Sequence, residues 1–117
     1  SFVYEKNYSL ADGNRIQVVY DYTISNFRSN ISLDQIADVS NMTKTSFCKY
    51  FKKRTNKTYF EFLNELRIQH ACKLLREDID QSISAIAYDS GFKNIANFNR
   101  QFKFIRGMTP STYRVLD

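Results

Sequence analysis

Several residue types are scarce in this chain of 117 residues, and each scarcity excludes a class of protein. With one proline and three glycines, little of the chain can be loop. The two cysteines, Cys48 and Cys72, form no CxxC pair, and His70 is the single histidine, so no metal-ligand spacing appears. No apolar run reaches the roughly 18 residues of a membrane span, and the first residues show no secretory signal pattern. We therefore expect no metal, no cofactor and no membrane contact.

Catalytic patterns are missing as well. The sequence has no Ser/His/Asp or Cys/His set in evident register, no glycine-rich phosphate loop and no pair of carboxylates in an apolar frame. An enzyme is therefore not expected. Hydrophobic residues make up 43% of the chain, which is enough to build the core of one domain.

The positive charge of this chain is concentrated in two stretches. The net charge is +5, yet residues 42–58 and residues 90–107 contain no acidic side chain at all. Their basic residues are Lys44, Lys49, Lys52, Lys53, Arg54 and Lys57 in the first stretch, and Lys93, Arg100, Lys103 and Arg106 in the second. Two separate acid-free stretches favour contact with a polyanion at two places.

The two basic stretches lie in two copies of one sequence pattern. The matching residues are Ile36, Ala37, Ser40, Phe47, Phe51, Lys52 and Thr58 in the first copy, and Ile86, Ala87, Ser90, Phe98, Phe102, Lys103 and Thr109 in the second. Asn41 and Asn56 stand where the second copy has Gly91 and Gly107, and Asn accepts the left-handed backbone conformation at small cost. Each copy therefore indicates a short helix, a tight turn and a second, basic helix.

Apolar residues at helical spacing predict an all-α fold of about seven helices. We expect helices at about 15–28, 33–39, 44–54, 59–77, 83–89 and 95–106, and a short last helix opened by Thr109-Pro110. The expected N-caps are Asn14, Ser32, Thr43, Ser82 and Asn94. Residues 1–13 show no clear period, so we interpret them as a linker remnant or an extension from a missing upstream domain, and residues 14–117 as the domain itself.

A short helix, a turn of three to four residues and a second helix form the helix-turn-helix motif, whose second helix enters the major groove of DNA. The first motif is expected at about 32–54 and the second at about 83–106, joined by a linker helix at about 59–77. That helix spans roughly 28 Å, close to the roughly 34 Å between successive major grooves on one face of B-DNA. The pattern predicts one chain that reads two adjacent grooves.

The pattern resembles the DNA-binding domain of the AraC/XylS family of bacterial transcription regulators, from about Asn14 to the C-terminus. The residues that carry the resemblance are Ile86-Ala87, Ser90-Gly91-Phe92, Phe98 to Lys103, Gly107 to Pro110 and Tyr113-Arg114, with Leu33 to Ala37, Phe51-Lys52, Leu66 to Ile68, Ala71 and Leu74-Leu75 in the first half. Asn41 and Asn56 depart from the glycines usual in the family. The resemblance implies a cytoplasmic regulator at the bacterial nucleoid, often an activator that recruits RNA polymerase, with a separate sensing or dimerisation domain.

The resemblance also implies which residues contact duplex DNA. Base-edge readers would be Lys44, Thr45, Cys48 and Lys49 in the first motif, and Asn94, Ala96, Asn97 and Arg100 in the second. Phosphate contacts would be Ser32, Lys52, Lys53, Arg54, Lys57, Ser82, Lys93, Lys103 and Arg106. Arg and Lys suit guanine, Asn suits adenine, and Ala or Thr can contact a thymine methyl group.

Two other readings of a basic helical domain stay open, namely an RNA-binding module and a protein-interaction module. The aromatic residues fall on predicted buried stripes, whereas proteins that bind single strands need exposed stacking platforms. The sequence therefore favours duplex DNA over both alternatives.

Overall fold

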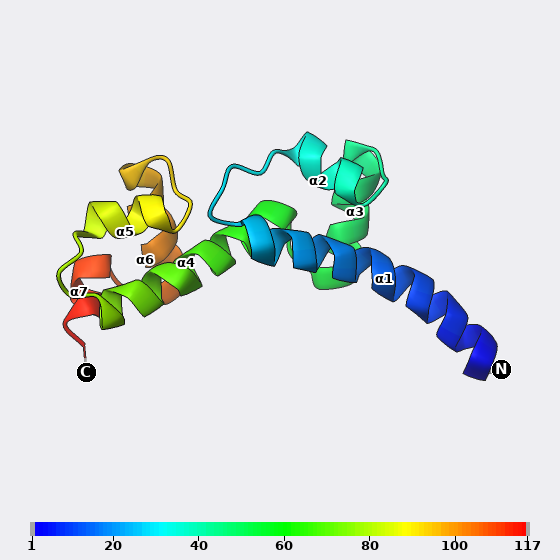
Figure 1. Ribbon diagram of the computed structural model, residues 1–117, viewed down its shortest axis with the longest axis horizontal. Coiled ribbons are helices and arrows are strands. Elements are labelled where there is room, and N and C mark those ends of the chain that lie inside the picture. The colour runs from blue at the N-terminus through cyan, green and yellow to red at the C-terminus, as the bar shows by residue number, and fades with distance from the viewer. Residues whose placement is uncertain (1, 117) are drawn as a thin grey trace. The chain divides into compact units, whose positions relative to one another are not determined.

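The computed structural model describes residues 2–116, with the side chains of residues 13–116 (Figure 1). The described residues form seven α-helices and no strand, which confirms the predicted all-α fold with two helix-turn-helix units. The helices are α1 (Phe2–Asn26), α2 (Leu33–Val39), α3 (Lys44–Thr55), α4 (Tyr59–Glu77), α5 (Ile83–Asp89), α6 (Ile95–Arg106) and α7 (Pro110–Arg114). None of these helices is long and apolar enough to cross a membrane.

The start of the first helix differs from the prediction. Helix α1 begins at Phe2, so Asn14 lies inside it and is not its N-cap. Gly13 and Asn14 are weak helix formers, but a glycine inside a helix costs only about 1 kcal/mol relative to alanine, which does not end a helix that continues on both sides. Residues 2–13 are therefore helical, and their assignment to a linker or an upstream extension stays a prediction.

The chain divides into two compact units. The first unit contains Ser1–Asn26 and Ile31–Tyr59, and so includes α1, α2 and α3. The second unit contains Phe27–Asn30 and Phe60–Asp117, and so includes most of α4 together with α5, α6 and α7. Each copy of the sequence repeat therefore lies in its own unit.

Aromatic packing forms the core of the first unit. Phe47 and Phe51, one turn apart on α3, are fully buried, and each ring centroid lies 5.5 Å from that of Tyr59. The Tyr59 hydroxyl lies 2.7 Å from Thr23 Oγ1, which itself donates to the Val19 carbonyl oxygen at 2.7 Å. Because the single hydroxyl proton of Thr23 is used on Val19, Tyr59 is the donor to Thr23. The core of this unit thus fixes which face of α3 is turned inward.

The second unit repeats this arrangement with its own aromatic residues. Phe98 and Phe102 on α6 are fully buried, and the ring centroid of Phe102 lies 5.6 Å from that of Tyr113. Cys72 is buried in the same cluster, and burial raises the pKa of its thiol. Helix α7 ends at Arg114, and Leu116 lies exposed beyond it.

The predicted caps define both helix-turn-helix motifs. Ser32 and Gln35 form a capping box, and the side chains of Thr43, Ser82, Asn94 and Thr109 each accept a backbone N–H in the first turn of their helix. Asn41 and Asn56 adopt left-handed conformations with φ of 59° and 62°. In the first copy, asparagine therefore adopts the left-handed conformation that glycine adopts in the second, as the sequence predicted.

The segment of residues 27–30 belongs to the second unit although it follows α1. Arg67 on α4 donates from Nε to the Phe27 carbonyl oxygen at 2.7 Å and from Nη2 to the Ser29 carbonyl oxygen at 2.9 Å. Arg28 pairs with the Asp89 carboxylate and donates from Nε to the Asp89 carbonyl oxygen at 2.8 Å. Asp89 also lies 3.3 Å from His70 Nε2. These contacts attach the segment to α4 and to the end of α5.

Candidate nucleic-acid interface

Helix α3 presents the first candidate reading face. Burial of Phe47 and Phe51 turns the opposite side of the helix to solvent, and all four predicted base readers there are exposed. They are Lys44, Thr45, Cys48 and Lys49. The helix start is fixed by Thr43, whose Oγ1 accepts the Ser46 N–H at 3.2 Å. The first turn thus carries its readers on a capped, defined backbone.

A hollow of about 400 Å³ lies beside this face, between α2 and α3. It is lined by Leu33, Lys44, Thr45, Cys48 and Lys49, so four of its five lining residues are predicted readers. Leu33 was not predicted to lie there, because its position on the short α2 helix indicated only a helix start. The hollow gives this face an apolar floor next to its two lysines.

One predicted reader on α3 already has a partner within its own unit. Lys44 Nζ lies 3.3 Å from the Asp34 carboxylate on α2, and both side chains are largely exposed. An exposed ion pair of this kind contributes about 1 kcal/mol or less, so a phosphate or a base edge can replace the carboxylate at small cost. Lys49 and Thr45 lie on the same face and are exposed.

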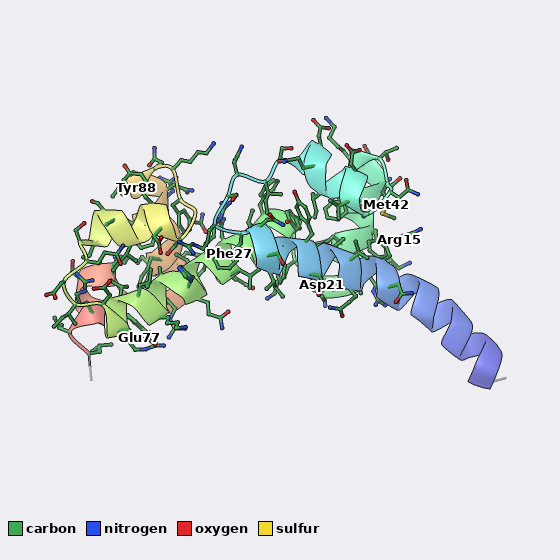
Figure 2. The ribbon with its side chains drawn as sticks, in the orientation of Figure 1. Arg15, Asp21, Phe27, Met42, Glu77 and Tyr88 are labelled. Atoms are coloured by element: carbon green, nitrogen blue, oxygen red, sulfur yellow. The ribbon has the colours of Figure 1, made fainter. Side chains whose placement is uncertain are left out.

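Helix α6 presents the second candidate reading face. Ala96 and Arg100 are exposed and Asn97 is half-buried. Arg100 donates from Nη2 to Asn97 Oδ1 at 3.2 Å, so the two side chains lie together on one face. Asn94 Oδ1 accepts the Asn97 N–H at 2.9 Å as the N-cap, which leaves the Asn94 amide NH₂ as its group for a base. Met42 and Tyr88, labelled in Figure 2, lie just before α3 and at the end of α5.

The predicted phosphate contacts are all exposed, and several make contacts inside the fold. They are Ser32, Lys52, Lys53, Arg54, Lys57, Ser82, Lys93, Lys103 and Arg106. Ser32 and Ser82 accept capping N–H groups with Oγ, so each hydroxyl proton is left for a phosphate oxygen. Lys52 Nζ reaches the Asn56 carbonyl oxygen at 3.4 Å, and the Arg106 guanidinium lies 5.4 Å from the Tyr113 ring centroid.

Two exposed aromatic residues near the second face were not among the predicted site residues. Phe104 on α6 is 82% exposed and Tyr88 on α5 is 55% exposed. Sequence reasoning missed Phe104 because aromatic residues on a periodic helix were assigned to buried stripes. Its position two residues after Phe102, on the opposite side of the helix, was the available signal. Among the described residues, no group of three or more His, Cys, Asp or Glu could hold a metal ion.

Comparison with known proteins identifies the family to which this chain belongs. Residues 36–115 match the helix-turn-helix domain family. An uncharacterised HTH-type transcriptional regulator of Staphylococcus aureus strain COL is 32% identical over 111 residues, which cover 95% of this chain and 15% of that protein. This chain therefore spans about 15% of the length of that relative.

Solved structures of other proteins share the fold. The DNA-binding domain of the global transcriptional factor AdpA, solved in complex with a target DNA, matches with a TM-score of 0.76 and 22% identity, over 82% of this chain and 86% of that one. A probable AraC family transcriptional regulator from Rhodopseudomonas palustris CGA009 matches with a TM-score of 0.79 and 24% identity, over 86% of this chain and 94% of that one. The family match shows that this chain belongs to the helix-turn-helix domain family, and the solved structures show that it shares the fold of AraC-type DNA-binding domains.

Proposed function

We propose that this domain binds duplex DNA sequence-specifically, with α3 and α6 each in the major groove and about one helical turn apart along one face of the duplex. The observation that carries the proposal is the pair of acid-free reading helices. Each helix buries two phenylalanines and turns to solvent a face of side chains that suit base edges and phosphates.

The proposed roles divide by position within each motif. Base edges are read by Lys44, Thr45, Cys48 and Lys49 on α3, and by Asn94, Ala96, Asn97 and Arg100 at the start and outer face of α6. Phosphates are contacted by Ser32, Lys52, Lys53, Arg54 and Lys57 in the first motif, and by Ser82, Lys93, Lys103 and Arg106 in the second. Arg100 is the strongest single reader, because its guanidinium can bond guanine O6 and N7 together.

Two further facts support the proposal. The AdpA domain, which has the same fold, is solved in complex with a target DNA. Helix α4 has 19 residues, so its length is roughly 28 Å, near the roughly 34 Å repeat of the major groove. We therefore propose that one chain contacts two groove segments without a second copy.

The full-length protein is proposed to be a transcription regulator with a further sensing or dimerisation domain. The match covers 15% of the staphylococcal relative, so about 85% of that protein lies outside it. The proposal rests on this difference in length. We propose the bacterial cytoplasm as its location, activation as its mode and RNA polymerase as its protein partner, as the family resemblance implies.

Mutation of one reader on each helix tests the proposal. Sites selected from random duplexes with the unmodified domain are compared with sites selected by Lys49→Ala and by Arg100→Ala. Each substitution is expected to cost about 1–3 kcal/mol of binding free energy and to relax base preference in its own half of the site. The two affected halves should lie about one helical turn apart.

Lys53→Ala is the matched control, because Lys53 is an exposed lysine on α3 proposed to contact phosphate. It should weaken all duplexes alike and leave the selected sequence unchanged. Relaxed preference at the same base pairs for Lys49→Ala and Arg100→Ala would contradict the two-reader arrangement. Stronger filter retention of RNA than of duplex DNA would favour the RNA-binding alternative instead.

A further inference from the structure

One aromatic side chain on the second reading helix is turned to solvent instead of the core. Phe104 on α6 is 82% exposed, the largest exposed fraction of any large hydrophobic residue in the described part of the chain. Phe98 and Phe102 on the same helix are fully buried. Single exposed hydrophobic residues are common on protein surfaces, so the exposure alone does not make a site. The position of Phe104 does distinguish it.

Phe104 lies on the same side of α6 as two predicted base readers. It follows Arg100 by four residues and Asn97 by seven, which places all three on one helical face. A hydrogen bond from Arg100 to Asn97 joins the first two of these side chains on that face. One turn of helix advances about 5.4 Å, and stacked base pairs rise about 3.4 Å. With Arg100 at a base edge, Phe104 is within reach of a base one or two pairs away.

The first motif has a different chemistry at the corresponding position. The offset that matches Phe51 with Phe102 and Lys52 with Lys103 also matches Lys53 with Phe104. Lys53 is an exposed cation on α3, which suits a phosphate oxygen. A phenyl ring cannot make that contact and suits an apolar group. The major groove offers one such group on its base edges, the C5-methyl group of thymine.

We propose that Phe104 contacts the C5-methyl group of a thymine in the part of the site read by α6, and so determines specificity in the second motif. The inference rests on the proposed function, since it needs α6 in the major groove. It adds an apolar contact, independent of charge, to the reading of guanine by Arg100. Removal of one buried methyl group changes a binding constant about fourfold.

Replacement of thymine by deoxyuridine tests the contact, since deoxyuridine lacks only the methyl group. Each thymine of the site selected by the unmodified domain is replaced in turn, and Kd is measured for the unmodified domain, Phe104→Ala and Lys53→Ala. At one thymine in the α6 half, the replacement should weaken the unmodified domain and Lys53→Ala about fourfold and leave Phe104→Ala unchanged. Phe104→Leu, which keeps an apolar side chain, should retain part of the effect.

Three outcomes overturn the inference. The first is no loss at any thymine in the α6 half, and the second is an equal loss for Phe104→Ala and the unmodified domain. The third is that Phe104→Ala binds DNA with normal affinity but reduces transcription, which would indicate that Phe104 contacts a protein and not DNA. Arg100→Ala on the same duplexes separates the two levels of failure. If Arg100→Ala relaxes preference in the α6 half and no thymine depends on Phe104, only the thymine contact fails. If neither substitution changes preference there, the proposed function fails with it.

Discussion

Substitution of Gly91 by alanine should destabilise the second unit strongly, for a reason that is local and geometric. A Cβ built at Gly91 lies 2.5 Å from the Phe27 carbonyl oxygen and 2.8 Å from Arg67 Nε. Distances under 3.0 Å force something to move. The Phe27 carbonyl group is backbone, and Arg67 Nε holds it at 2.7 Å. The φ angle of Gly91 is also +103°, which L-residues rarely adopt.

The expected cost of Gly91→Ala is the sum of two contributions. The left-handed backbone costs a residue with a Cβ about 1–2 kcal/mol. Displacement of the 27–30 segment weakens the hydrogen bond from the charged Arg67 to Phe27, which is worth about 1.5–3 kcal/mol. Together these give about 2.5–5 kcal/mol, a large share of the roughly 5–15 kcal/mol that stabilises a typical domain.

Gly107→Ala is the matched control. Gly107 has a φ of +78°, but a Cβ there meets nothing within 4 Å, so only the backbone cost of about 1–2 kcal/mol applies. Urea unfolding followed by far-UV circular dichroism gives both free energies of unfolding. Equal losses for Gly91→Ala and Gly107→Ala would refute the argument that contact with the 27–30 segment, and not the φ angle, decides the cost.

Two predictions concern the candidate interface itself. The exposed Cys48 should be alkylated rapidly, and bound duplex DNA should protect it. Cys72 should react only after unfolding, because it is buried and the raised pKa of its thiol keeps it protonated at neutral pH. Alkylation is followed by mass spectrometry, and equal modification of Cys48 with and without DNA would exclude Cys48 from the interface. The logarithm of the DNA-binding constant should fall linearly with the logarithm of the salt concentration. Lys53→Ala should reduce the magnitude of this slope by about 0.9, as expected for the loss of one phosphate contact. An unchanged slope in a fluorescence-anisotropy titration would show that Lys53 contacts no phosphate.

The sequence predicted α3 and α6 closely because the information that defines them is local. Thr43 and Asn94 are cap residues within the first turn of each helix, and the phenylalanine stripes recur at intervals of four residues. Both helix starts follow from such short-range chemistry. The faces turned to solvent follow in turn from which residues are buried.

Contacts between residues far apart in the sequence could not be predicted in the same way. Arg28 and Asp89 are 61 residues apart, and nothing in the helical periodicity of either segment pairs them. The ion pair of Lys44 with Asp34 depends on how α2 packs on α3, which the periodicity of either helix does not give. The start of α1 was missed for the opposite reason, since Gly13 and Asn14 are weak local signals that the continuing helix overrides.

The two copies differ most where they face solvent, and this has a consequence for the DNA site. The core pairs Phe47 with Phe98 and Phe51 with Phe102 are identical, because each packs against aromatic neighbours in its own unit. Lys52 and Lys103 are the same, but four other matched surface positions differ, with Thr45, Cys48, Lys49 and Lys53 opposite Ala96, Asn99, Arg100 and Phe104. A dimer of identical subunits reads two equal half-sites, but two motifs with different readers cannot. We therefore expect an asymmetric site, in which the α3 half is recognised mainly through charge and the α6 half through Arg100, Asn97 and an apolar contact.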